Sequence, residues 1–205
     1  MNSYSLRLKR KGAEMKTLLF VNACVGKEKS RTLELANAYI DKFVERSGED
    51  YEIKNLELND INVKIQDKDE LEKRENLIAS GKFDDEMFDL AKEFMSADYI
   101  VIGAPFWDLQ FPALLKIYLE RISVTYLTFI YDEMGIPHGQ CRAKKAAYVM
   151  TAGGYSEGMN YGYEYVKGLF TKLFSFDDVK LISAEGLDIF GNNPDEILRE
   201  AIEKI

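Results

Sequence analysis

Short runs of apolar residues alternate with longer amphipathic segments along most of the chain. Four runs are apolar at nearly every position, which is typical of strands buried on both faces of a sheet: 17–23, 99–105, 144–154 and 179–187. A fifth segment, 51–58, alternates apolar and polar residues and predicts a half-exposed strand at a sheet edge. The pattern therefore predicts five strands.

The segments between these strands have helical periodicity. Ser30 is a suitable N-cap for a first helix, and Gly48 lies where a left-handed residue would end it. The charged region 67–96 predicts two helices separated by Gly81. Three further helices are expected: one with Pro112 in its first turn that ends near Ile122, one near 160–174, and one opened by Pro194.

This alternation predicts an α/β fold, a doubly wound open parallel sheet of five strands with helices on both faces. We expect residues 15–205 to form one domain and residues 1–14 to be a flexible N-terminal extension. The segment 125–131 has strand chemistry but no neighbouring strand, so a loop and a hairpin arm remain open alternatives.

Composition narrows the possible partners. The formal net charge of −8 disfavours binding to nucleic acid, and no apolar run is long enough to span a membrane. The N-terminus has no apolar signal segment, and two cysteines form no disulfide framework, so we expect a cytoplasmic protein. We find no catalytic triad and no metal-ligand cluster, so no catalytic side chain or metal ligand is assigned.

Three predicted strands end in unusual loops, and ligands in such sheets bind beyond the carboxyl ends of the strands. The first loop, VNACVGKEKSRT (21–32), leads into a helix N-terminus, which attracts anions. A plain helix cap with basic surface residues is the alternative. The sequence matches neither the P-loop nor the dinucleotide-binding fingerprint.

A cysteine phosphatase is a sharper alternative for the first loop. Such enzymes place five residues between the nucleophilic Cys and the Arg, whereas six residues separate Cys24 from Arg31. The chain also has no Asp-Pro pair to supply the usual general acid. We therefore expect Cys24 to pack at the strand end, although a helix N-terminus can lower the pKa of a thiol.

The other two loops carry aromatic residues and glycines. In APFWDLQFP (104–112), Phe106 and Trp107 suit a flat aromatic ligand or a partner surface, unless the loop folds back on its own core. In TAGGY (151–155), paired glycines allow a backbone to approach a ligand closely, and they equally suit a tight turn.

Together these loops resemble those of the FMN-dependent NAD(P)H:quinone oxidoreductase and azoreductase family, which has a flavodoxin-like fold. The resemblance covers about residues 15–190, and its most specific parts are APFWDLQFPALLKIYLERI and AKKAAYVMTAGG. It implies an FMN cofactor, NADH or NADPH as co-substrate, and a homodimer with the flavin near the interface. Two positions depart from the family pattern: Asp108 replaces a common Asn, and Ala143 replaces the usual Gly.

The resemblance also implies site residues. Ser30, Arg31 and Thr32 would hold the FMN phosphate, with Asn22 and Ala23 lining the same loop. The isoalloxazine ring would be bordered by Pro105, Phe106, Trp107, Asp108 and Leu109, and its pyrimidine side by Thr151, Ala152, Gly153 and Gly154. An acceptor pocket would include, more loosely, Phe129, Tyr131, His138 and Tyr155.

The implied activity is a two-step electron transfer, in which NAD(P)H delivers a hydride to the flavin and leaves before an acceptor binds. The acceptor would be a small aromatic molecule: a quinone, azo or nitro compound. His138 is alternatively a surface or turn residue, and Tyr155, Tyr161, Tyr163 and Tyr165 suit pocket lining, dimer contact or helix packing. An FMN electron carrier serving protein partners and a flavin-free binding domain are the competing functions.

Overall fold

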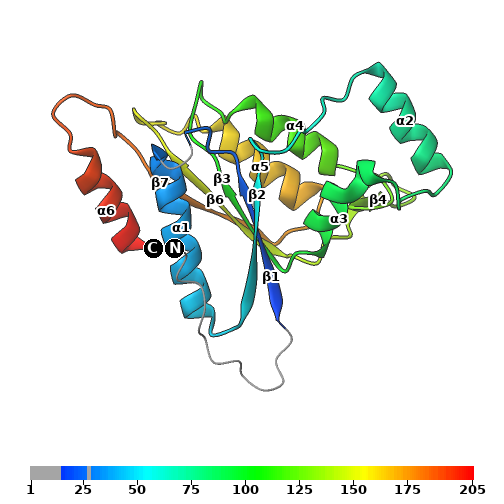
Figure 1. Ribbon diagram of the computed structural model, residues 1–205, viewed down its shortest axis with the longest axis horizontal. Helices are drawn as coiled ribbons and strands as arrows, with labels where there is room; N and C mark the ends of the chain where they lie inside the picture. Colours follow the sequence, from blue (N-terminus) through cyan, green and yellow to red (C-terminus); the bar gives the residue numbers. More distant parts are fainter. Residues whose placement is uncertain (1–14, 27–28) are drawn as a thin grey trace.

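A central parallel sheet organises the computed structural model, which describes residues 15–26 and 29–205 (Figure 1). The strand order is β2-β1-β3-β6-β7. The strands are β1 (Lys16–Asn22), β2 (Tyr51–Glu57), β3 (Tyr99–Gly103), β6 (Lys145–Thr151) and β7 (Asp178–Ala184). All four pairings are parallel, so the predicted doubly wound, five-stranded sheet is confirmed. The expected extension, 1–14, lies outside the described residues.

Helices cover both faces of this sheet, as the alternating pattern predicted (Figure 1). On one face lie α1 (Arg31–Ser47) and α6 (Pro194–Lys204), and on the other lie α3 (Asp89–Ser96), α4 (Ala113–Ile122) and α5 (Tyr161–Lys172). Successive residues of β1 alternate between the two cores: Leu18 and Phe20 pack beneath α1, whereas Leu19 and Val21 pack beneath α3 and α4. This two-sided burial explains the nearly continuous apolar runs.

Local signals set the helix boundaries. The Ser30 hydroxyl accepts the N–H of Leu33 at 3.2 Å, and Gly48 ends α1 with a φ of 67°. Gly81, also at a φ of 67°, separates α2 (Lys68–Ala79) from the short η2 (Glu86–Phe88) that precedes α3. Pro112 is the residue before α4 rather than part of its first turn. Pro194 opens α6 as expected.

Three predicted strands end earlier in the structure than the apolar runs from which they were predicted. β3 ends at Gly103, β6 at Thr151 and β7 at Ala184, whereas the runs continue to residues 105, 154 and 187. The remaining residues leave the sheet and begin loops at its carboxyl edge. The half-exposed segment forms β2, and it lies at the sheet edge as its alternation indicated.

The isolated segment 125–131 supplies one arm of a hairpin. β4 (Phe129–Tyr131) pairs antiparallel with β5 (Pro137–Gly139), outside the main sheet. Phe129 is buried against Phe174, with ring centroids 6.4 Å apart, and the N–H of Gly139 donates to the Ser175 hydroxyl at 2.7 Å. The hairpin is therefore anchored beyond the C-terminal end of α5.

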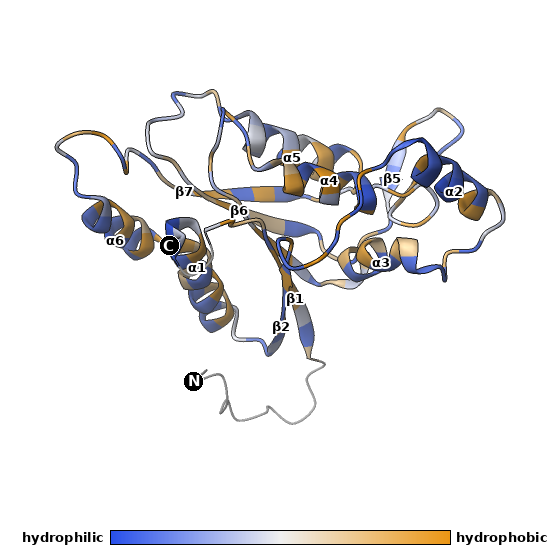
Figure 2. Cartoon of the chain, turned by 45° about the horizontal axis from the view of Figure 1, so that its top comes forward, coloured by the Kyte–Doolittle hydropathy of each residue, from blue (hydrophilic) through white to orange (hydrophobic). Residues whose placement is uncertain are grey.

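The helix α2 lies outside both layers and contains no fully buried residue. Its exposed face is strongly hydrophilic (Figure 2). The Arg74 guanidinium donates to the carbonyl oxygens of Glu120, at 3.3 Å, and of Ser123, both at the C-terminal end of α4. Polar contacts with a helix end thus hold α2 against the molecule. Over residues 15–26 and 29–205, no helix combines the length and apolarity that crossing a membrane requires.

Replacing Gly139 by Ala is expected to destabilise the protein. A Cβ atom there would lie 1.8 Å from the carbonyl oxygen of Phe174, so backbone would have to move. Overpacking of this kind typically costs about 1–3 kcal/mol. The measurement is urea unfolding followed by circular dichroism, with a lower midpoint expected for Gly139→Ala.

Gly168→Ala is the matched control, because a Cβ at this helical position in α5 meets no atom within 4 Å. An alanine there should raise stability by about 0.5–1 kcal/mol. Equal behaviour of the two variants would contradict the packing assigned to the hairpin.

Candidate functional site

The order of strands reverses between β1 and β3, since β2 lies to one side of β1 and the later strands lie to the other. Ligands of open parallel sheets bind beyond the carboxyl ends of strands at such a point. Four segments meet there, which we name the first loop (23–30), the tip loop (104–112), the glycine loop (152–160) and the fourth loop (185–193). Lys27 and Glu28 of the first loop lie outside the described residues.

The first loop leads into α1, whose first residue is a cation. Arg31 is the first residue of this helix, and its side chain is 40% exposed. The free N–H groups and dipole at a helix N-terminus favour an anion, and the guanidinium adds a full positive charge. Asn22 is committed elsewhere, because its amide donates to Glu57 at 2.7 Å and accepts the Cys24 N–H at 2.9 Å.

Cys24 packs inside the protein, as the sequence predicted. Its side chain is buried, with Sγ 3.6 Å from the carbonyl oxygen of Gly103. Burial raises the pKa of the thiol to about 11, and the Ser30 hydroxyl opposes this shift only partly. The thiolate that a cysteine phosphatase requires is therefore scarce at neutral pH, which argues against that alternative.

Two buried hydroxyls join the start of α1 to the end of β6. Thr32 Oγ1 and Thr151 Oγ1 lie 2.6 Å apart, and both side chains are buried. The Thr32 hydroxyl therefore bridges two elements in this structure. The bridge fixes the first loop relative to the glycine loop.

The tip loop turns sharply beside the glycine loop. Trp107 and Gln110 exchange two backbone hydrogen bonds, at 3.1 and 2.8 Å, and the residues between them, Asp108 and Leu109, have φ values of 51° and 66°. Positive φ at both central positions is the signature of a type I′ turn. The turn exposes 49% of Trp107, whereas Phe106 is partly buried against the core.

Backbone hydrogen bonds fix this turn against its neighbours. The Phe106 N–H donates to the carbonyl oxygen of Thr151 at 3.0 Å. The Tyr161 N–H, at the start of α5, donates to the carbonyl oxygen of Leu109 at 3.1 Å. Trp107 is thus presented at the edge where the glycine loop begins.

The glycine loop and the fourth loop are joined along their backbones. The N–H groups of Gly186, Leu187 and Asp188 donate to the carbonyl oxygens of Gly154, Ala152 and Gly153 respectively, over 2.9–3.1 Å. From this position Asp188 reaches Arg31, with Oδ1 3.0 Å from the guanidinium Nη2. The fourth loop therefore connects the N-terminus of α1 to the glycine loop.

Residues 16–205 match the family described by its flavodoxin-like fold. The chain belongs to this family. It is 35% identical over 195 residues to an FMN-dependent NADH:quinone oxidoreductase 2 of Clostridium acetobutylicum, which spans 93% of this chain and 96% of the relative. The resemblance found in the sequence is confirmed.

Solved structures give the same fold for this flavodoxin-like protein. An azoreductase from Bacillus anthracis superimposes with a TM-score of 0.80 at 22% identity, over 93% of this chain and 96% of that one. An FMN-dependent NADH-azoreductase from the same species, solved in complex with FMN, gives a TM-score of 0.76 at 23% identity, over 93% and 95% of the two chains.

Sequence reasoning missed the fourth loop of the flavodoxin-like chain. Its signal was partly hidden, because AEGLD (184–188) overlaps the end of the predicted buried strand 179–187, whose carboxyl end lies at the same sheet edge as the other loops. Tyr155, 60% exposed, lies over Gly186 of this loop, where a Cβ atom would approach the tyrosine ring to 2.9 Å. Tyr155, a residue of the glycine loop, therefore adds an aromatic surface beside the fourth loop.

Three residues assigned to an acceptor pocket lie elsewhere in this chain. Phe129, Tyr131 and His138 belong to the hairpin beyond the C-terminal end of α5, whereas the four loops lie at its N-terminal end (Figure 1). Phe129 is buried, and His138 pairs with Asp132 at 2.9 Å. One chain by itself does not bring these residues to the loops, so their pocket role stays a prediction that requires a second copy.

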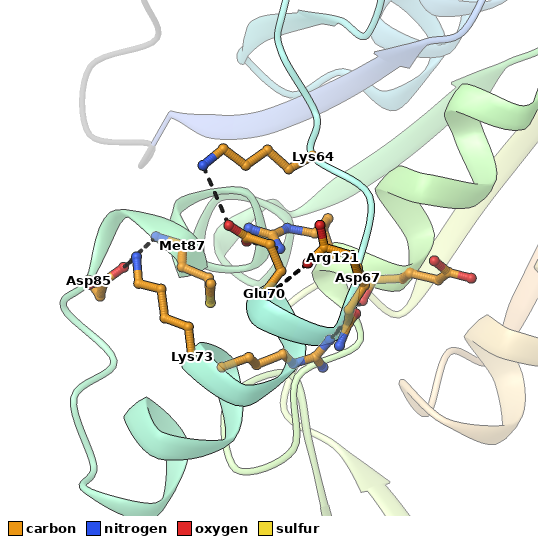
Figure 3. A network of polar contacts seen from close by, with 10 residues as sticks. Lys64, Asp67, Glu70, Lys73, Asp85, Met87 and Arg121 are labelled. Carbon is orange, nitrogen blue, oxygen red and sulfur yellow. Dashed lines mark hydrogen bonds and ion pairs between the residues drawn. The ribbon is translucent and has the colours of Figure 1, made fainter.

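A hollow of about 340 Å³ lies away from the loops, between α2, α3 and the end of α4. Several of its charged side chains are paired: Glu70 contacts Lys64 at 3.4 Å and Arg121 at 2.9 Å, and Lys73 contacts the neighbouring Asp85 at 3.4 Å (Figure 3). The hydrogen bond from Arg121 lowers the pKa of Glu70. The network holds α2 in place.

Both thiols of this flavodoxin-like protein are expected to react slowly with Ellman's reagent at pH 8. Cys24 and Cys141 are buried, and burial raises their pKa values to about 11 and about 12. The labelling rate should increase as the pH rises toward these values. In urea, both thiols of the wild-type chain should react rapidly, and the Cys24→Ser variant should show one reactive thiol per chain. A rapidly labelled thiol in the folded wild type that Cys24→Ser abolishes would contradict the packing role.

Proposed function

We propose that this protein is an FMN-dependent oxidoreductase that transfers electrons from NADH or NADPH to quinone, azo or nitro-aromatic acceptors. The observation that carries the proposal is the meeting of Arg31, the glycine loop and the exposed Trp107 at the strand-order reversal. The relatives named as FMN-dependent NADH:quinone oxidoreductases support the same cofactor and donor.

The donor set at the start of α1 fits the phosphate of FMN. A phosphate carries close to two negative charges and several acceptor oxygens. Arg31 supplies a planar, charged fork of N–H donors, and the helix N-terminus supplies backbone N–H groups. The Ser30 hydroxyl accepts the Leu33 N–H and lies within hydrogen-bonding reach of the Cys24 sulfur, so its hydrogen can point either to that sulfur or to the phosphate.

The tip and glycine loops fit the planar ring of the cofactor. Pro105, Phe106, Trp107, Asp108 and Leu109 would border one edge, and Thr151, Ala152, Gly153 and Gly154 would approach the pyrimidine side. A Cβ atom at Gly154 would meet no neighbour within 4 Å, so the glycine leaves open space beside the backbone. The aromatic surfaces of Trp107 and Tyr155 give an exposed apolar rim.

Bound FMN supplies hydride acceptance from the reduced nicotinamide and electron donation to the acceptor, so no catalytic side chain is required. The residues of this chain would bind the phosphate and border the ring. NADH or NADPH would bind first, and its oxidised form would leave before the acceptor binds. This order is the ping-pong sequence.

Asp108 places a carboxylate at the tip turn, where the resemblance puts the flavin ring. Its φ of 51° is held by the type I′ turn, so the residue belongs to a defined backbone. A negative charge there disfavours additional negative charge on the ring through Coulomb repulsion. We therefore infer that Asp108 tunes the reduction potential of the bound cofactor.

The proposed assembly is a cytoplasmic homodimer. The hairpin exposes Tyr131, Met134 and Ile136, and a second copy would be needed to bring such residues toward the loops of its neighbour. An FMN electron carrier that serves protein partners is the alternative, favoured by the net charge of −8, which suits long-range attraction to basic partners.

Holo-protein mixed anaerobically with NADH, and separately with NADPH, distinguishes these functions. The enzyme should lose its oxidised-flavin absorbance with at least one nucleotide, and a quinone added afterwards should restore it. A carrier would keep its flavin oxidised with both nucleotides. Protein that shows no flavin spectrum after addition of FMN would favour a flavin-free binding domain instead.

Arg31→Ala is expected to weaken FMN binding about 10- to 100-fold, since a hydrogen bond to a charged group contributes about 1.5–3 kcal/mol. Flavin fluorescence titration measures the dissociation constant. Arg199→Ala, which removes an exposed cation that pairs with Glu196 on α6, should leave it unchanged. Unchanged FMN affinity in Arg31→Ala would refute the phosphate role.

A further inference from the structure

The guanidinium of Arg31 is bound by the protein itself. Its Nη2 lies 3.0 Å from Oδ1 of Asp188, and its Nη1 donates to the carbonyl oxygen of Leu187 at 3.4 Å. Both partners belong to the fourth loop, and both draw the cation toward the glycine loop. The charge that suits a phosphate is therefore already shared with a carboxylate.

Asp188 is held in this position by its backbone. Its N–H donates to the carbonyl oxygen of Gly153 at 2.9 Å, and the N–H groups of Gly186 and Leu187 make equivalent bonds to the glycine loop. Its Oδ2 lies so close to Gly153 that a Cβ atom on that glycine would be 2.5 Å away. The carboxylate consequently stands between the first loop and the glycine loop, while its side chain remains 68% exposed.

A phosphate that binds Arg31 must accommodate this carboxylate. If the guanidinium turns away from Asp188, the ion pair is lost. If the pair persists, the dianion lies close to a second negative charge and is repelled. Either outcome reduces the binding free energy that the Arg31–phosphate contact contributes. Neither outcome changes the affinity for a flavin that lacks the phosphate.

We propose that Asp188 competes with the cofactor phosphate for Arg31 and thereby lowers the preference of the site for a phosphorylated flavin over an unphosphorylated one. This inference rests on the proposed FMN function and assigns a specificity role within the same site. It makes Asp188 a determinant of how readily the protein exchanges FMN, distinct from the residues that hold the cofactor.

Asp188→Asn tests the inference, because asparagine has the same shape and retains the backbone bonds of the loop while it removes the charge. Full-length protein freed of flavin is titrated with FMN and with riboflavin, following flavin fluorescence. We expect FMN to bind about 2- to 5-fold more tightly to the variant, the range given by exposed ion pairs. Riboflavin affinity should be unchanged, and the gain should shrink as salt is added.

Glu200→Gln is the matched control, since it removes one negative charge from the exposed surface of α6. An equal gain in FMN affinity there would assign the effect to net charge and overturn the proposal. Weaker FMN binding by Asp188→Asn would overturn it in favour of a carboxylate that orients Arg31, and unchanged binding would overturn it as well. If wild-type protein binds neither flavin, the proposed function itself fails.

Discussion

Parallel strand pairing is the constraint on which the rest of the structure depends. Because β1, β3, β6 and β7 run in one direction, the segments that follow them emerge at one edge of the sheet. Residues far apart in sequence then become neighbours: Arg31 contacts Asp188 across 157 positions, and Thr32 contacts Thr151 across 119. The loops need few specific interactions with one another to become neighbours, because the parallel strands already place them at the same edge of the sheet.

Positive and negative groups both lie at this edge of the sheet, so it differs from a purely positive anion site. A helix N-terminus and Arg31 provide positive potential, while Asp188 and Asp108 place carboxylates in the fourth loop and at the tip turn. The overall charge of −8 adds a repulsive background for any phosphate. Local arrangement, rather than total charge, therefore decides whether an anion binds.

Much of the fold was predictable from the sequence, since burial on both faces leaves a direct record in the apolar runs. The helix boundaries at Ser30, Gly48 and Pro194 followed from the chemistry of their caps. The second strand of the hairpin could not be predicted in this way, because Pro137–Gly139 contains a proline, a histidine and a glycine and has no strand pattern. Strand ends were also overestimated, since Ala104 and Ala152 are as buried in their loops as they would be in a sheet.

The loops that form the candidate site could be predicted from the sequence, whereas the contacts between them could not. The three loops were recognisable because each had an unusual composition next to a buried strand. The fourth loop was missed, since its contacts with the glycine loop are made by backbone groups that any sequence can provide. The involvement of Asn22 with Glu57 likewise depends on a pairing of β1 with β2 that residue types do not reveal.

The tip turn affects the entropy cost of binding a ligand. Leu109 adopts a left-handed conformation that costs a residue with a Cβ atom about 1–2 kcal/mol, yet its carbonyl oxygen is held by Tyr161 and its neighbours close the turn. The entropy of ordering this segment is thus lost when the chain folds, not when a ligand arrives. A planar ligand would bind beside a turn that is already ordered. Its affinity would therefore depend on how well its shape fits the turn, and not on a rearrangement of the turn.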